Sequence, residues 1–451
     1  MRRRFPMWAV LVGGYLLLGR PFSYLGISPL FIGEAYLLIQ ILWNRHNWLG
    51  RFVNDVARLE LLSFAIFLHL AWGLVEVFRA LYMHRPMIDV FRTTAFNYYP
   101  LYCLIGIMIG KEISLQTYLK IWKYIVILAT VQILVEPVLN LWDSFGVEMP
   151  MPPLFTMAII CLWEYFAAWK TLYVLLAVSM LPDFFQGAHG HRSWVLGLLA
   201  GLISIAASKP KLFLKWVMIS LGGFTVLMFV GPLIPGPEGS SPPLDPVVQI
   251  AHILASHDPN LAIKIVKWRH YGNEVSSIKD EEGTAVWRKA IWQGALNSLN
   301  TLELQVMGIG EGVSLQGITP DGQDIHTPHN ISIYCLYYTG WIGLIIFTFL
   351  MFALLHAARQ IRNPALRKQL IATILVAIVI TMTGNLLEAP FGAIPFYLIC
   401  GVIIGLGRRE AAAKRMPQFR SYRLMDHPLE PEPSLAQPAW FSRPRTGIGR
   451  A

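Results

Sequence analysis

The stretch "HTPHNISIYCLYYTGWIGLIIF", from His326 to Phe347, joins a short polar segment directly to a long apolar run. A run of this length and composition predicts a helix that crosses a membrane. Asn330 is a favoured residue type at a helix N-cap, and Pro328 ends any preceding helix, so the predicted helix begins at Ile331. The sequence therefore places His329 at the mouth of a membrane helix.

The composition of the whole chain agrees with a membrane protein. The 451 residues are 55% hydrophobic and 14% charged, with a mean hydropathy of +0.49, whereas soluble domains carry about 25% charged residues. Uncharged runs alternate with short basic loops, which predicts an all-α polytopic integral membrane protein. The net charge of +10 is interpreted as basic cytoplasmic loops and not as a nucleic-acid surface.

The apolar segments give a predicted topology of about twelve transmembrane helices. The basic "MRRR", "RNPALRK" and "RREAAAKR" stretches place both ends in the cytoplasm, which requires an even number of crossings. Pro153–Leu181 is then either a tight hairpin or a re-entrant element, because both of its ends are predicted outside. The eleven segments are Pro6–Leu18, Ile27–Trp43, Leu59–Phe78, Ala95–Gly110, Ile121–Leu141, Pro153–Leu181, Ser193–Ala207, Leu212–Gly231, Ile331–His356, Leu370–Leu387 and Phe391–Leu406.

Four regions follow from this topology. Residues 1–231 hold the N-terminal transmembrane helices, 232–330 form one large extracytoplasmic loop containing short helices, and 331–407 hold the C-terminal transmembrane helices. Residues 408–451, rich in Pro and Arg, are predicted to be a disordered cytoplasmic tail. In the loop, "GIGEG" from Gly308 to Gly312 is interpreted as a glycine-rich turn, since no βαβ context supports a nucleotide-binding reading.

His329 is the first candidate for chemistry. A helix N-terminus lowers the pKa of a nearby imidazole, which keeps the ring neutral and able to accept a proton. The residue is therefore a candidate general base at the outer membrane face. The alternative is a histidine that only hydrates or caps a helix end. The four cysteines lie in apolar segments without metal-ligand spacing, so the sequence predicts no metal site, disulfide or cofactor.

Arginines on the predicted outer side are the second candidates. Arg192 precedes an apolar span, Arg288 lies in the outer loop, and Arg79, Arg85 and Arg92 fall in "RALYMHRPMIDVFR". Basic residues outside go against the positive-inside bias, and guanidinium groups bind phosphate well, so they predict an anionic, phosphate-bearing ligand. The alternative is that each arginine reaches to lipid headgroups. The acidic residues near apolar runs (Glu34, Glu76, Glu164 and Glu388) are interpreted as structural ion pairs or interfacial positions.

The order of these features resembles the O-antigen ligase and Wzy-type polymerase superfamily. The quoted stretch is preceded by "GTAVWRKAIWQGALNSLNTLELQVMGIGEG". This family carries a W-R…W helix, a G-x-G-x-G turn, and then H-N leading into a helix with a G-x-x-G step, here Gly340 and Gly343. A G-x-x-G step suits close helix packing. "GHRSWVLGLLAGL" is similar to the family's S-R-G segment, with Arg192 matching its arginine and His191 and Ser193 replacing the Ser and Gly. The resemblance covers roughly residues 189–405.

The resemblance implies a metal-independent, inverting glycosyltransferase at the periplasmic face of the bacterial inner membrane. Its donor would be a glycan on undecaprenyl diphosphate, and its acceptor a glycan or lipid-linked hydroxyl. His329 and Arg288 would be catalytic, and Arg192 and Arg85 would join Arg288 in binding the diphosphate. Asn330 and the turn glycines Gly308 and Gly310 would support the site. The lipid bilayer and a chain-length regulator are the further partners expected, and nucleic acid is not.

Three functions remain open. A loose similarity of "GRPFSYLGISPLFIGEAYL" to exopolysaccharide polymerases favours a polymerase. An O-antigen ligase, which transfers glycan to lipid A core, is the alternative within the family. A transporter of an anionic substrate is the alternative from another class, although such a protein is expected to show repeat halves and midplane charges.

Overall fold

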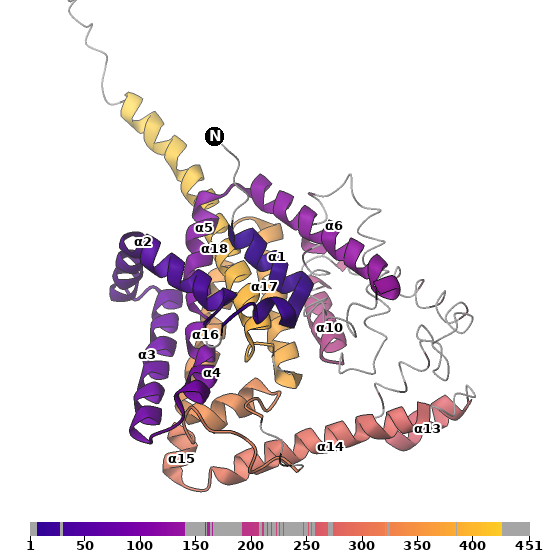
Figure 1. The fold of residues 1–451 in the computed structure, drawn as a ribbon. Helices are drawn as coiled ribbons and strands as arrows, with labels where there is room; N and C mark the ends of the chain where they lie inside the picture. The colour runs from indigo at the N-terminus through magenta and orange to yellow at the C-terminus, as the bar shows by residue number, and fades with distance from the viewer. Residues whose placement is uncertain are drawn as a thin grey trace, which may run out of the picture.

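The computed structural model shows a bundle of long helices with helical elements crossing one end (Figure 1). It describes residues 7–27, 30–139, 158, 160–162, 165, 192–206, 210–211, 214, 218, 222, 225, 229, 247, 251, 254, 258–268, 274–320, 322, 325–384 and 386–425. The elements are α1 (Met7–Ser23), β1 (Gly26–Ile27), β2 (Leu30–Phe31), α2 (Ile32–Ala57), α3 (Leu61–Tyr82), α4 (Met87–Tyr98), α5 (Leu101–Glu112), α6 (Leu115–Leu139), α10 (Arg192–Ala206), α13 (Pro259–Trp268), α14 (Glu274–Ser298), α15 (Leu302–Met307), α16 (Ile331–Arg359), α17 (Pro364–Thr383) and α18 (Pro390–Met425).

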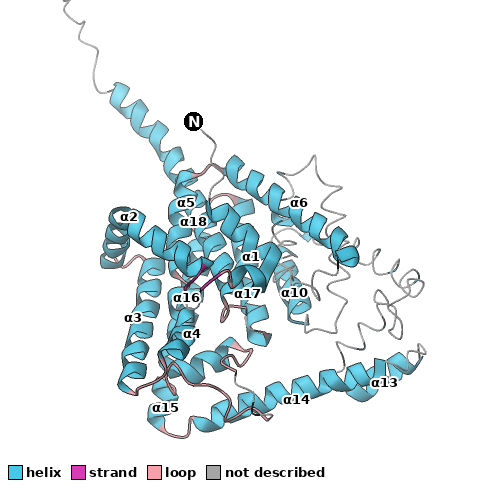
Figure 2. Ribbon diagram, viewed as in Figure 1, coloured by secondary structure: helices cyan, strands magenta, loops and turns pink. Residues whose placement is uncertain are grey.

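Four of the described helices are long and apolar enough to cross a membrane. They are α3, α16, the part of α17 from Pro364 to Met382, and the part of α18 from Pro390 to Ala412. The described chain is thus mostly helical and has four candidate membrane-spanning helices, which agrees with the predicted all-α membrane protein. Figure 2 shows that the described chain is helical apart from its loops and one antiparallel strand pair, β1 with β2.

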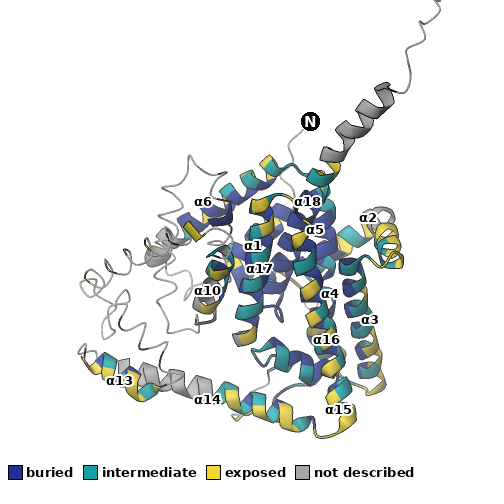
Figure 3. Ribbon diagram, turned by 180° about the vertical axis from the view of Figure 1, so that it is seen from behind, coloured by how far each residue is buried: buried dark blue, intermediate teal, exposed yellow. Residues whose placement is uncertain are grey.

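The centre of the bundle depends on glycines in α5 and α18. Gly106 and Gly110 of α5 face Gly401 and Gly405 of α18, and a Cβ atom at any of the four positions would clash with a backbone atom of the other helix. Such a spacing of small residues lets two membrane helices approach until their backbones touch. Figure 3 shows that this region is the most deeply buried part of the structure.

Ionic contacts define one end of the bundle. Glu60, the N-cap of α3, accepts a hydrogen bond from the Ser63 amide at 2.8 Å and pairs with Arg408 of α18. Arg409 donates to the backbone carbonyl of Glu112 at the end of α5 at 3.0 Å. At the opposite end, where α3 finishes and α16 begins, lie α15 and the described residues of the chain that joins it to α16. We call this opposite end the loop end.

Several predicted segments differ in the structure. The predicted span Ala95–Gly110 is two helices, α4 and α5, with a break at Tyr99 and Pro100, since proline lacks the amide hydrogen that would continue the ladder. The predicted span Ile27–Trp43 begins as a strand pair, and only Ile32–Trp43 of α2 is apolar. At about 1.5 Å per residue this part is shorter than the roughly 30 Å hydrocarbon core.

The sequence predicts disorder from residue 408, whereas α18 continues to Met425 in the structure. The stretch "RREAAAKRM" consists mostly of strong helix formers, which explains the continuation. The expected helix around Arg288 is confirmed as α14, although its 25 residues make it longer than the short helices expected in this loop. Most of the predicted hairpin Pro153–Leu181 lies outside the described residues.

Replacing Gly401 by alanine is expected to destabilise the protein by about 1–3 kcal/mol, because the new methyl group would meet the Cys103 carbonyl of α5. The measurement is the thermal unfolding midpoint of the detergent-purified protein. Gly50→Ala in α2 is the control, since a Cβ there meets nothing within 4 Å. Equal midpoints for the two variants would argue against the glycine contact.

Candidate functional site

The site at the loop end is organised by a break in α16. Gly340 has a left-handed backbone conformation with φ 65°, so the helical hydrogen-bond pattern is interrupted there. The carbonyls of Tyr337 and Tyr338 instead accept hydrogen bonds from the Ile309 and Gly310 amides, at 2.7 and 3.0 Å. The break in a membrane helix thereby provides the acceptors for a loop that is distant in sequence.

The segment Gly308–Gly312 is a turn, as predicted, and we call it the glycine loop. Gly308, Gly310 and Gly312 all have positive φ, between 73° and 97°, a conformation that glycine adopts without a steric penalty. A Cβ at Gly308 would meet the Tyr338 backbone, and one at Gly340 would meet Val306. The close packing expected at Gly340 is thus a contact of α16 with the end of α15, the short helix that leads into this loop.

Arg79 has a structural role. Its guanidinium donates to the carbonyls of Met307 and Gly308 at 2.8 and 2.7 Å and lies 3.4 Å from the fully buried carboxylate of Glu76. These contacts hold the end of α15 against α3. The interpretation of Glu76 as part of a structural ion pair is confirmed, and the suggestion that Arg79 contacts phosphate is not supported by this arrangement.

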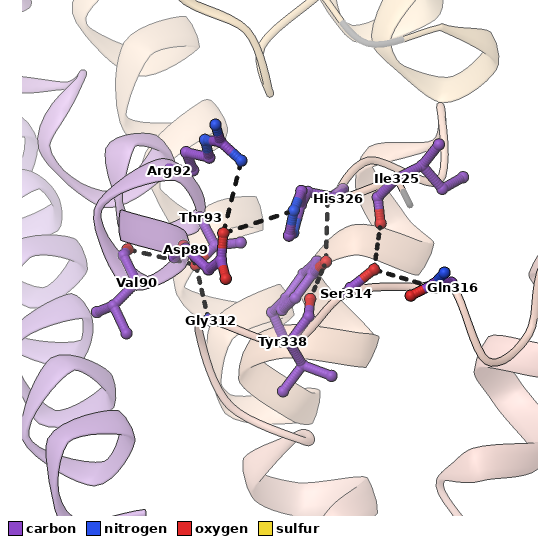
Figure 4. A network of polar contacts seen from close by, with 11 residues as sticks. Asp89, Val90, Arg92, Thr93, Gly312, Ser314, Gln316, Ile325, His326 and Tyr338 are labelled. Atoms are coloured by element: carbon purple, nitrogen blue, oxygen red, sulfur yellow. Dashed lines mark hydrogen bonds and ion pairs between the residues drawn. The ribbon is translucent and has the colours of Figure 1, made fainter. Parts of the chain in front are cut away.

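One face of α4 carries a row of polar residues that the sequence-based reading missed. Asp89, Thr93 and Asn97 are spaced by four residues, so they lie on one face of the helix. The Thr93 hydroxyl accepts from the Gly312 amide at 2.9 Å, and its carbonyl accepts from the Tyr334 hydroxyl at 2.7 Å. Figure 4 shows this face turned toward the chain around Gly312 and His326. The four-residue spacing of these polar residues, next to an apolar run, is the sequence feature that could have revealed this polar face.

Glu311 is buried within this network. Its side chain is fully shielded from solvent, and its Oε1 accepts a hydrogen bond from Asn97 Nδ2 at 3.0 Å. Burial raises the pKa of the Glu311 carboxyl to about 7, although hydrogen bonds from Thr93 and Asn97 oppose the shift. The glycine loop is thus joined to α4 through a carboxyl group that changes charge near neutral pH.

His329 stands directly before α16. Asn330 caps this helix, as predicted: its Oδ1 accepts from the Ser332 and Ile333 amides at 2.9 and 3.2 Å, and its Nδ2 donates to the Met382 carbonyl of α17. His329 itself has a positive φ of 55°, which is uncommon for a residue with a side chain. A tight change of chain direction thus precedes the helix.

The electrostatic surroundings of His329 keep the ring neutral. Burial, together with the positive charges of Arg288 and Arg20, lowers the pKa of the His329 imidazole to about 4. Burial likewise lowers the pKa of Arg288, which lies on α14. At neutral pH the histidine therefore carries no charge, and a neutral imidazole has one ring nitrogen that can accept a proton.

The structure thus brings together two of the predicted residues, His329 and Arg288, and adds Arg20. Arg20 was overlooked although it follows an apolar run, as a charged residue in "LLLGRPFSY". It is exposed at the end of α1, just after a backbone break at Gly19 with φ 56°. Its charge and its position beside His329 make it a further candidate for contact with an anion.

The other predicted arginines are placed differently. Arg192 begins α10, which packs along α17, and its side chain lies outside the described part of the chain. Arg85 lies against Gly312, where its Cβ is 3.1 Å from the position of an added Cβ, and it is close enough to act electrostatically on Tyr337. The diphosphate-binding roles of Arg192 and Arg85 remain predictions.

Comparison with known proteins finds no family model that matches this chain and no curated protein whose sequence matches it.

Arg79→Met is expected to destabilise the protein by about 3–5 kcal/mol, because it leaves Glu76 buried without its ionic partner. The additional change Glu76→Gln should recover part of this loss. Thermal midpoints in detergent measure both effects, and Arg92→Gln serves as the control because the Arg92 side chain is 58% exposed. A stable Arg79→Met protein would contradict the structural role of this arginine.

Glu311→Gln is expected to change how stability depends on pH. The pKa of Glu311 is about 7 in the folded protein and 4.5 ordinarily, so between these values the folded state binds more protons and its stability falls as pH rises. Glutamine keeps the acceptor for Asn97 but does not ionise. From pH 5 to 8 the variant should therefore gain up to about 3 kcal/mol relative to wild type. Parallel curves of thermal midpoint against pH would contradict this.

Proposed function

We propose that this protein is a membrane glycosyltransferase that moves a glycan from undecaprenyl diphosphate to an acceptor hydroxyl. The observation that carries the proposal is the half-buried His329 at the start of a membrane helix, where burial and the nearby charges of Arg288 and Arg20 lower the pKa of its imidazole to about 4. A neutral imidazole suits proton transfer, and two guanidinium groups suit a diphosphate. The motif order in residues 189–405 supports the same function through the family resemblance.

In the proposed reaction the acceptor hydroxyl oxygen forms a bond to the anomeric carbon while the bond from that carbon to the diphosphate oxygen breaks. The electron pair of the broken bond goes to the diphosphate, and the hydroxyl proton goes to a ring nitrogen of His329. Attack in line with the leaving group inverts the anomeric configuration. Arg288 and Arg20 stabilise the charge that develops on the diphosphate, whose negative charge in turn favours the protonated His329.

The proposal includes a topology and a location. The chain crosses the inner membrane of a bacterium about twelve times, its large loop lies in the periplasm, and the loop end of the bundle faces that side. This arrangement is supported by the basic "MRRR" and "RREAAAKR" stretches, which favour cytoplasmic ends. The lipid-borne donor would reach His329 from the bilayer, and the mechanism needs no metal ion.

A polysaccharide polymerase is the preferred version of this function, and an O-antigen ligase is the alternative. A polymerase extends one chain repeatedly and produces a ladder of lengths, with a chain-length regulator as its expected partner. A ligase transfers a finished glycan once to lipid A core. A transporter of an anionic substrate is the candidate from another class. The charged candidates gather at the loop end, whereas a transporter is expected to bind near the bilayer midplane.

His329→Ala and Arg288→Ala are expected to abolish transfer, by removing the proton acceptor and one diphosphate contact. The test expresses each variant in a strain that lacks the protein, and it measures surface polysaccharide on gels and lipid-linked glycan in membrane extracts. We expect loss of polymer, on the order of 100-fold or more, together with accumulation of the lipid-linked donor. A ladder in the wild-type lane would favour polymerase over ligase.

Two matched controls separate catalysis from folding. His356→Ala changes a histidine at the opposite end of the same helix, and Lys289→Ala changes the exposed cation next to Arg288. Both should retain wild-type polymer, and all four variants should reach equal membrane abundance. Wild-type polymer in both His329→Ala and Arg288→Ala would reject the proposed function. If the His329→Ala and Arg288→Ala variants lost uptake of an anionic solute and did not accumulate the lipid-linked donor, the result would support the transporter.

A further inference from the structure

A second histidine lies three residues before His329 and is held by a different helix. The Nε2 atom of His326 is 3.8 Å from Oδ1 of Asp89, which lies in the first turn of α4. The same Asp89 oxygen is 3.5 Å from the guanidinium of Arg92. Figure 4 shows the two contacts meeting at this oxygen. The contact between Asp89 and His326 joins α4 to the segment 325–330, which contains His329.

His326 is poorly placed to act on a substrate directly. Both ring nitrogens are buried, and its side chain is only 17% exposed. A general base needs its nitrogen within hydrogen-bond reach of the proton it removes. The effect of His326 on any reaction at His329 must therefore pass through the backbone that joins the two residues.

That backbone is held at several points. The His326 carbonyl accepts a hydrogen bond from the Tyr338 hydroxyl at 3.0 Å, and the Pro328 carbonyl accepts one from the Trp292 Nε1 at 2.7 Å. These contacts attach the segment to α16 and α14. The His326–Asp89 pair attaches it to α4, whose Thr93 also holds the glycine loop through the Gly312 amide.

We propose that Asp89 and His326 are positioning residues that hold the segment 325–330 against α4 and thereby set the place of His329. The expected effect of these two residues on a reaction rests on the proposed function, whereas their expected effect on the position of the segment 325–330 does not. His329 has an uncommon positive φ, and such a conformation persists only where surrounding contacts over-determine it. The contact to α4 is one of those constraints, because it fixes the chain three residues before the turn.

The test is a double-mutant cycle with Asp89→Asn, which removes the carboxylate charge, and His326→Gln, which removes the imidazole; both changes keep a polar side chain of similar size. The assay uses purified protein in nanodiscs with the lipid-linked glycan that accumulates in cells lacking the protein. We expect each single variant to lose about tenfold in kcat with KM for this donor changed less than about twofold. The double variant should be no slower than the slower single variant, because both changes remove the same contact.

His356→Gln is the matched control, since it makes the same substitution as His326→Gln at the opposite end of α16 and leaves the contact between His326 and Asp89 in place. Its kcat should stay within about twofold of wild type. Losses that multiply in the double variant would overturn the inference, because they would indicate independent effects. A rise in KM with unchanged kcat would also overturn it, since that result indicates donor binding and not placement of His329.

A second readout is independent of activity. Hydrogen–deuterium exchange of peptides covering residues 325–335 should be faster in Asp89→Asn and His326→Gln, equally fast in the double variant, and unchanged in His356→Gln. Unchanged exchange in the first two variants would overturn the inference even if activity fell. If wild-type protein transfers no glycan but the exchange pattern appears, the proposed function fails while the structural coupling stands.

Discussion

The interruption of α16 at Gly340 is the constraint on which the rest of the loop end depends. A membrane helix normally uses its own carbonyls, and in a medium without water any freed carbonyl needs another donor. Here the carbonyls of Tyr337 and Tyr338 accept the Ile309 and Gly310 amides. The break and the glycine loop therefore require each other, and glycine is needed on both sides because the backbones approach so closely.

Polar groups on both sides of this contact hold the glycine loop in place. Arg79 binds the carbonyls at the start of the glycine loop, and Glu76 balances its charge. On the other side, Thr93 and Asn97 of α4 bind Gly312 and Glu311. The polar groups that hold the loop thus come from α3, α4 and α16, which are distant in sequence. Together these contacts provide a rigid base for the segment that leads to His329.

The arginines around the site have two different roles. Arg79 is committed to protein carbonyls and a buried carboxylate, whereas Arg288 and Arg20 act on a neutral histidine. Two arginines close enough to act on a half-buried, neutral imidazole suit a ligand that bears phosphate groups, which is the physical link between this arrangement and the proposed donor.

Sequence alone determined the features that depend on local chemistry. The hydrophobic runs predicted membrane helices, Asn330 predicted the start of α16, and alternating glycines predicted the turn at 308–312, because each of these depends on the residue and its immediate neighbours. Only the tertiary structure decided which cations serve the fold and which lie by His329. Arg79, Arg85 and Arg20 are equivalent in a sequence pattern, but the groups they approach (the Met307 and Gly308 carbonyls, Gly312, and His329) lie more than two hundred residues away in the chain. Whether a guanidinium is occupied by carbonyls depends on those contacts and not on spacing along the chain.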